Sequence, residues 1–276
     1  MTNSRAEARG DAARPWADLA GVRAIAFDCY GTLIDFGDHH FIDLMDVVSL
    51  RLELGIEGKT LFDRWLQQSK EVWRARGRDP ENPTAGPEPQ FGTYDEIWID
   101  QFERTFHELE LEGDARGAYD LMVEHLRQAP PYAEARDVIE QLRSRYTLCV
   151  LSNADDSWLH ACLGAADLQF DQIVSSESAR SYKPRARIFH ATATMLGVQP
   201  AELLYVGDSP IADVLGARNA GLPVAWINRY GATLPDTVPA PDLELTDLRG
   251  LLPLLLGRTS PPAPLLPERG AYNREV

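Results

Sequence analysis

The chain has 276 residues, of which 44% are hydrophobic, enough to build one large domain or two smaller ones around a buried core. Its formal net charge is −15 at pH 7, and no basic cluster is dense enough to track a phosphate backbone, which argues against nucleic acid and favours a small-molecule partner. No apolar run approaches the roughly 20 residues of a membrane span, and three cysteines without a CxxC pair fit a reducing compartment, so we expect no membrane partner and a cytoplasmic location.

The predicted elements begin after a polar N-terminal tail, residues 1–20. The apolar run VRAIAF, residues 22–27, leads into Asp28-Cys-Tyr-Gly, a pattern typical of a buried strand that feeds a loop. Strand-like runs then disappear, and helical periodicity predicts four helices, at 39–54, 60–76, 93–110 and 114–128. We interpret residues 36–129 as a helical insert after the first strand, because so long an excursion within one α/β layer is uncommon.

From residue 130 onward, strands and helices alternate. Further strands are predicted at 146–153, 170–176, 202–209 and 222–228, with helices at 134–144, 156–164, 185–196 and 211–220. This alternation predicts an α/β fold with a parallel sheet and helices on both faces, built from residues 21–35 and 130–257. The Pro-rich residues 258–276 are expected to form a C-terminal tail.

Polar side chains gather where the predicted strands end. Ligands of open parallel sheets bind beyond these carboxyl ends, near the point where the strand order reverses. The residues that meet this condition are Asp28, Ser152, Asn153, Lys183, Asp208 and Asp213. We expect these side chains to share one site.

These residues lie in four segments that resemble the signature motifs of the haloacid dehalogenase superfamily of hydrolases. The segments are DCYGT at residues 28–32, the Ser152-Asn153 pair, Lys183-Pro184, and GDSPIAD at residues 207–213. One such motif is weak evidence, but four in the family's order are strong. The resemblance implies a Rossmann-like core, a helical cap formed by the insert, and hydrolysis of a small anionic substrate through a covalent intermediate on Asp28.

The resemblance also implies a role for each motif residue. Asp28 would attack the substrate as a carboxylate, and Lys183 would keep Asp28 ionised and neutralise substrate oxygens. Gly31 would let loop amides point at an anion. The other predicted catalytic or substrate-binding residues are Thr32, Ser152 and Asn153 as polar donors, and Asp213 as a second acid near a metal or an orienter of Lys183. The predicted ligands of a Mg²⁺ ion are Asp28, Asp208 and the backbone carbonyl of Tyr30.

Tyr30 occupies the position where superfamily phosphatases usually carry an aspartate that protonates the leaving group. A phenol with an ordinary pKa of about 10 is a poor proton donor at neutral pH. Halide needs no proton to leave, and Asp-x-Tyr-Gly-Thr is similar to the first motif of the L-2-haloacid dehalogenases. Those enzymes use an arginine of the cap to bind the substrate carboxylate or halide, and Arg64 is the nearest candidate in this chain.

The fourth motif favours a different reaction. The dehalogenases carry a Ser-Ser-Asn type sequence there and use no metal, whereas GDSPIAD is similar to the motif of Mg²⁺-dependent phosphatases. A Mg²⁺ site has no use in dehalogenation, so we expect a Mg²⁺-dependent phosphatase that acts on a small phosphorylated metabolite. The alternative is a metal-independent 2-haloacid dehalogenase, and a third hypothesis is a binding protein whose chemistry has lapsed. The sequence does not determine the oligomeric state, and a homodimer is one of the states that it allows.

Overall fold

The structure, a computed structural model, describes residues 19–257; the predicted tails lie outside this range, except for residues 19 and 20. A parallel sheet of six strands forms the core, in the order β3-β2-β1-β4-β5-β6. The strands are β1 (Ala24–Phe27), β2 (Thr147–Ser152), β3 (Gln172–Ser175), β4 (Leu203–Gly207), β5 (Val224–Ile227) and β6 (Leu243–Leu245). This order confirms the predicted Rossmann-like α/β fold, and its direction reverses at β1, which lies between β2 and β4.

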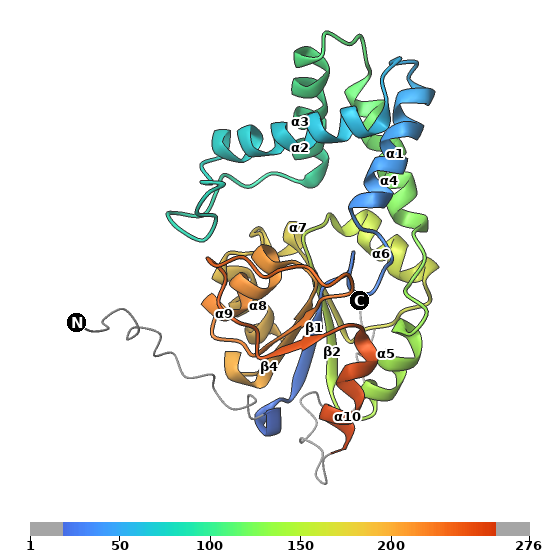
Figure 1. Cartoon of the computed structure of the whole chain (residues 1–276). Helices are drawn as coiled ribbons and strands as arrows, with labels where there is room; N and C mark the ends of the chain where they lie inside the picture. Colours follow the sequence, from blue (N-terminus) through green and yellow to red (C-terminus); the bar gives the residue numbers. More distant parts are fainter. Residues whose placement is uncertain (1–18, 258–276) are drawn as a thin grey trace, which may run out of the picture.

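The two faces of the sheet bury alternate residues of each strand, as a pleated strand requires. In β1, Ile25 and Phe27 pack into one core cluster, whereas Ala24 and Ala26 pack into the other. The helices of the core are α5 (Ala135–Arg143), α6 (Asp156–Ala165), α7 (Ser176–Ala179), α8 (Ala186–Met195), α9 (Gly216–Asn219) and α10 (Leu251–Leu256), with the short helical turns η1 (Leu19–Gly21), η2 (Pro200–Glu202), η3 (Pro210–Leu215) and η4 (Leu248–Gly250). Figure 1 shows α8 and α9 on one side of the sheet and α5 and α10 on the other.

One predicted core helix, at 211–220, differs in detail. It is divided into η3, which is a π-helical turn, and the short helix α9. The serine before η3 accepts the N–H of Ala212 on its side-chain oxygen, so Ser209 caps this turn. The π-helical turn places Asp213 inward, where it is fully buried.

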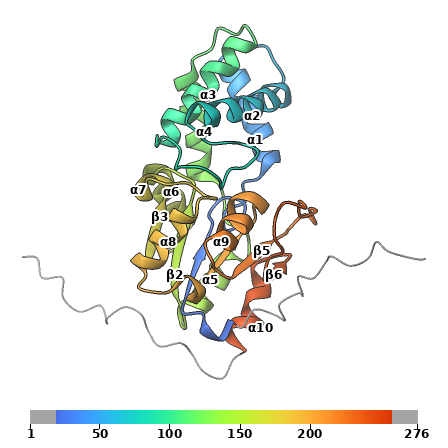
Figure 2. The same ribbon diagram turned by 90° about the vertical axis from the view of Figure 1, so that its left-hand side faces the viewer.

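Four helices follow β1, close to the predicted bounds: α1 (Asp38–Arg51), α2 (Gly58–Ala75), α3 (Tyr94–Glu108) and α4 (Ala115–Gln128). We call residues 36–129 the cap. Figures 1 and 2 show the cap as a layer beyond one end of the sheet, on the side where α6 and α7 lie. Because α6 and α7 follow the carboxyl ends of β2 and β3, the cap covers the carboxyl ends of the strands.

Aromatic side chains pack the cap against the core. Trp98 of α3 stacks on Trp158 of α6, with ring centroids 5.6 Å apart and an interplanar angle of 22°. Tyr94 meets the edge of the same indole at 6.4 Å. All three side chains are buried, so one apolar cluster runs from the cap into the core.

No helix within residues 19–257 combines the length and apolarity that a membrane crossing needs.

Candidate active site

Asp28 lies at the carboxyl end of the central strand. Its backbone N–H donates to the carbonyl of Val206 in β4 at 2.8 Å, which fixes the residue at the point where the strand order reverses. Its Oδ1 atom accepts a hydrogen bond from the Ser152 hydroxyl at 3.0 Å and lies 2.7 Å from Nζ of Lys183. The predicted nucleophile and two of its predicted partners are therefore brought together.

Lys183 is buried between two carboxylates. Its Nζ atom lies 2.7 Å from Asp28 and 2.7 Å from Asp213, and it donates to the Tyr205 hydroxyl at 2.9 Å. Burial alone would lower the pKa of Lys183, but Asp213 and Asp28 outweigh burial and raise the pKa above its usual value. The ammonium group therefore stays charged beside the nucleophile at neutral pH.

Tyr205 is a site residue that the sequence analysis missed. It lies on β4, and its hydroxyl is 3.0 Å from Oδ1 of Asp213 and 3.1 Å from the carbonyl of Leu151, in addition to its contact with Lys183. In the sequence, this tyrosine reads as one more aromatic residue of a buried strand. Its contact with Lys183 depends on the face of the sheet to which its side chain points, and that face is known only once the strands are assembled.

Asn153 contacts the backbone of Lys183. The N–H of Lys183 donates to Oδ1 of Asn153 at 2.8 Å, and Nδ2 of Asn153 donates to the Lys183 carbonyl at 3.1 Å. Both polar ends of the amide are thus used to hold the lysine. This arrangement gives Asn153 a part in positioning Lys183, and the substrate contact that the sequence analysis expected stays a prediction.

Asp208 approaches the site from the end of β4. Its Oδ1 atom accepts a hydrogen bond from the Thr32 hydroxyl at 3.1 Å. A Cβ atom at Gly31, where φ is +85°, would lie 2.4 Å from Oδ2 of Asp208, so only glycine leaves room for this carboxylate. Carboxylate oxygens of Asp28, Asp208 and Asp213 all lie within 4.8 Å of one another.

The pKa values of two of these acids, Asp208 and Asp28, are raised above their usual range. Burial raises the pKa of Asp208 to about 8, with further contributions from Asp213 and Asp28. Burial also raises the pKa of Asp28 to about 6, and Lys183 opposes this rise. Three acids share one lysine, so the metal-free site retains a proton on Asp208 that a bound cation would displace.

The donor set fits a Mg²⁺ ion at Asp28 and Asp208. Mg²⁺ is bound in proteins by one or two carboxylates together with water and substrate oxygens. Asp213 is already engaged, because its Oδ1 atom contacts Lys183 and Tyr205 and its Oδ2 atom accepts the N–H of Ser209 at 2.8 Å. Of the two roles predicted for Asp213, the geometry favours the orienter of Lys183.

Tyr30 extends into the apolar contact between core and cap. Its ring lies 5.4 Å from that of Trp158 and 6.2 Å from that of Phe36, and its hydroxyl is 3.5 Å from the carbonyl of Leu126. Burial raises the pKa of Tyr30 far above its usual value. The phenol is therefore a still weaker acid here than in water, and its hydroxyl faces a backbone carbonyl.

Arg64 is not brought to this cluster. It lies on the surface of the cap, where its guanidinium pairs with Glu108 at 2.7 Å and donates to Gln67 at 3.1 Å. Its side chain remains 38% exposed. The amphipathic helix that carries Arg64 turns this residue outward, and helical spacing alone does not distinguish an outward arginine from one that faces the cleft.

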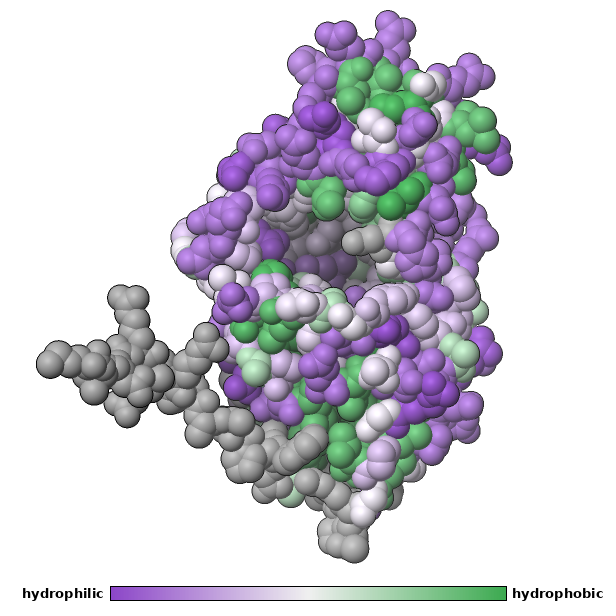
Figure 3. Space-filling view, viewed as in Figure 1, coloured by the Kyte–Doolittle hydropathy of each residue, from purple (hydrophilic) through white to green (hydrophobic). Residues whose placement is uncertain are grey.

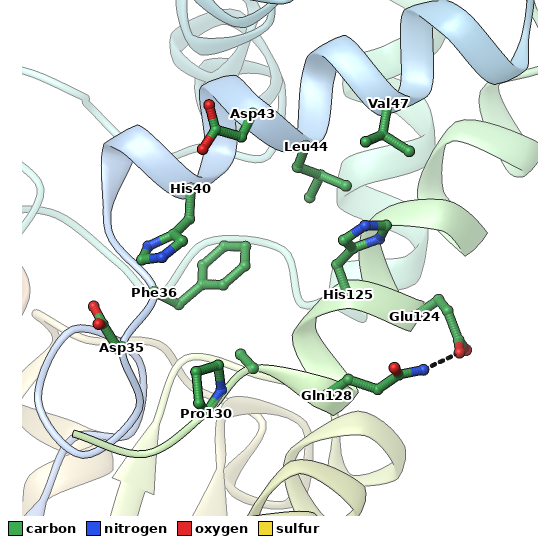
Figure 4. Close-up of a pocket in the computed structure, with 11 residues that line it drawn as sticks. Asp35, Phe36, His40, Asp43, Leu44, Val47, Glu124, His125, Gln128 and Pro130 are labelled. Carbon is green, nitrogen blue, oxygen red and sulfur yellow. Dashed lines mark hydrogen bonds between the residues drawn. The ribbon is translucent and has the colours of Figure 1, made fainter. Parts of the chain in front are cut away.

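Two cavities of about 310 Å³ lie near the junction of cap and core. One of them is lined by Gly31 and Asp208 and therefore reaches the site, and Figure 3 shows that the surface is hollowed between cap and core. The other lies between α1 and α4, where Figure 4 shows Phe36, Leu44 and His125 turned toward one another. No predicted site residue lines this second cavity, so we place the site at the first.

Comparison with known proteins agrees with the motifs. A family model described as haloacid dehalogenase-like hydrolase matches residues 22–221. The (S)-2-haloacid dehalogenase 4A of Burkholderia cepacia is 30% identical over 244 residues, which cover 85% of this chain and 95% of that protein. The N-acylneuraminate-9-phosphatase of Rattus norvegicus is 26% identical over 251 residues, which cover 86% of this chain and 95% of that protein.

The fold agrees as well. A crystal structure of a dehalogenase with an intermediate complex matches with a TM-score of 0.66 and 26% identity, over 85% of this chain and 97% of that one. The family match includes all four motifs, and those motifs bring their side chains to one place beneath the cap. The chain belongs to the haloacid dehalogenase-like hydrolases.

Proposed function

We propose that Asp28 forms a transient ester with a small anionic substrate, and that water then cleaves this ester. The contact that supports the proposal is the one between Asp28 and Lys183, which holds a carboxylate beside a permanent positive charge at the end of the central strand. Asp213, Tyr205 and Asn153 each support the lysine in that position.

The substrate that we propose is a short 2-haloacid, and the observation that carries this choice is the position of Tyr30. The residue that would protonate an alkoxide is a tyrosine whose hydroxyl faces the Leu126 carbonyl and whose pKa is raised by burial. Halide leaves as an anion and needs no acid. One relative that matches this chain over 95% of its own length is an (S)-2-haloacid dehalogenase. The comparisons therefore favour the reaction that the sequence analysis placed second.

The chemistry balances without any further reactant. An Oδ atom of Asp28 bonds to C2 of the haloacid, and the C–halogen bond breaks with its electron pair leaving on the halide. Water then adds to the carbonyl carbon of the Asp28 ester, which releases a 2-hydroxy acid and restores the carboxylate. One proton and one halide ion are released for each water consumed.

A phosphatase is the second candidate, and Asp208 is the observation that favours it. This carboxylate lies with Asp28 and Asp213 in a set that suits a divalent cation, and a phosphatase is among the relatives that match along most of their length. A Mg²⁺ ion held there would neutralise negative charge on the substrate. The absence of an acid at Tyr30 would restrict such an enzyme to leaving groups that depart without protonation.

One paired assay separates the two reactions. Chloride release from (S)-2-chloropropionate and phosphate release from p-nitrophenyl phosphate are each measured in EDTA and in Mg²⁺, with Asp28→Asn as the inactive control. We expect chloride release that persists in EDTA and stops in the control. Phosphate release that requires Mg²⁺ and disappears in Asp208→Asn, without chloride release, would instead support the phosphatase. Neither product from the unmodified protein would favour the lapsed binding protein.

A further inference from the structure

The catalytic lysine lies between two residues whose side chains are held by the cap. Lys183 belongs to the short segment 180–185 that joins α7 to α8. On one side of it, Tyr182 is 1% exposed, and on the other, Arg185 is 5% exposed. Both side chains bind the cap loop, residues 76–93, which joins α2 to α3.

Tyr182 inserts its ring into the cap. Its hydroxyl accepts the N–H of Gly92 at 2.9 Å and also contacts the Gly92 carbonyl. Its ring packs against Trp73 at 4.8 Å, Phe91 at 5.7 Å and Tyr94 at 6.1 Å, all of them cap residues. The cap therefore fixes the side chain of the residue next to the lysine.

Arg185 is held by the cap loop through backbone oxygens. Its Nη1 atom donates to the carbonyl of Thr84 at 3.0 Å and to that of Gly86 at 2.9 Å. Its Nε and Nη2 atoms are buried without hydrogen-bond partners. A buried guanidinium with only part of its donors satisfied gains little net stability. The contact of Arg185 with the cap loop therefore contributes little to the stability of the fold.

Two more contacts bind the same loop to the same segment. The Ser181 hydroxyl donates to Glu88 at 3.1 Å, and the guanidinium of Arg180 lies 4.3 Å from the ring centroid of Phe91. The core holds Lys183 through its backbone contacts with Asn153 and through the end of its side chain. The placement of Nζ thus depends on a segment that the cap loop covers along its length.

We propose that Tyr182 and Arg185 are positioning residues that couple closure of the cap loop to the placement of Lys183 against Asp28. This inference rests on the proposed covalent function of Asp28, but not on which leaving group departs. With the cap loop in place, Lys183 lies 2.7 Å from both carboxylates. When the loop moves away, the residues on both sides of Lys183 lose their partners, so the lysine loses its fixed position.

The test compares Tyr182→Phe and Arg185→Met with Arg104→Met, which makes the same substitution at an exposed arginine of the cap. The measurements are steady-state kcat and KM and the single-turnover rate of ester formation on Asp28, with melting temperature as the check on folding. We expect ester formation and kcat to fall about 10- to 100-fold in both segment variants. KM should change less than about threefold, and Arg104→Met should match the unmodified protein. Arg185→Lys, which keeps a donor for one carbonyl, should recover part of the loss.

The outcomes separate this inference from the proposed function. An unmodified protein that forms no ester on Asp28 overturns both. An unmodified protein that forms the ester, with segment variants that form it equally fast, overturns only the positioning role. A rise in KM alone with unchanged kcat also overturns it, because that result would assign Tyr182 and Arg185 to substrate binding. Should Arg185→Met fail to fold, Tyr182→Phe and Arg185→Lys, which change the fewest contacts, decide the question.

Discussion

Gly31 is the residue that sets how closely Asp208 approaches the nucleophile. A Cβ atom there would lie 2.4 Å from Oδ2 of Asp208, and φ is +85°. We expect Gly31→Ala to lower kcat at least about tenfold and to cost about 1–2 kcal/mol of stability, as measured by kinetics and urea denaturation. Gly77→Ala is the control, because Gly77 has φ +83° but nothing within 4 Å of the added atom. If both variants lose activity equally, backbone strain and not the approach of Asp208 is responsible.

The charge on Asp28 predicts the pH dependence of the first chemical step. Burial raises its pKa to about 6, against the opposing effect of Lys183, and only the carboxylate form is a nucleophile. Without added metal, the single-turnover rate of ester formation should therefore rise as the pH increases through about 6 and level off above pH 7. A rate that stays constant between pH 5 and pH 7 would contradict this assignment.

At the scale of elements, one core carboxylate caps a helix of the cap. Asp155, at the start of α6, accepts the N–H groups of Tyr94 and Asp95 at 2.8 and 2.9 Å, and these residues begin α3. We expect Asp155→Ala to lower the free energy of unfolding by about 1–2 kcal/mol. Asp114→Ala is the matched control, because Asp114 precedes α4 but makes no capping hydrogen bond. Equal losses in the two variants would show that the contact across the interface contributes nothing of its own.

The elements also show where prediction from sequence ends. Long periodic segments such as α2 and α3 lie within about two residues of their predicted bounds, because an apolar stripe at helical spacing has few other uses. Strand β6 was not predicted, since it has three residues and Glu244 interrupts its apolar pattern. The motif residues were placed together because the ends of parallel strands must meet. Tyr205 and the outward direction of Arg64 depend on side-chain facing, which spacing alone does not determine.

For the whole molecule, the raised pKa of Asp208 predicts that the free energy of unfolding falls as the pH increases. The folded, metal-free protein keeps a proton on Asp208 up to about pH 8, whereas an unfolded chain releases it near its ordinary pKa of about 3.9. The stabilisation is full below pH 4 and is lost as the pH rises through 8. Between pH 6 and pH 8, the free energy of unfolding in EDTA should fall by about 2 kcal/mol.

Asp208→Asn provides the control for this prediction, because the amide cannot titrate. Urea denaturation of the variant should show little of the fall between pH 6 and pH 8. An unmodified protein that becomes more stable over the same interval would show that Asp208 ionises freely in the fold. A variant that keeps the whole fall would assign it to other groups.

Acid-quenched mass spectrometry can detect the proposed bond between Asp28 and the substrate. The protein is mixed in excess with (S)-2-chloropropionate, quenched within one turnover, digested and analysed for the peptide that contains residue 28. We expect an ester on Asp28 that forms as chloride appears and decays as lactate appears. Chloride release at an undiminished rate, with that peptide unmodified at every time point, would contradict it.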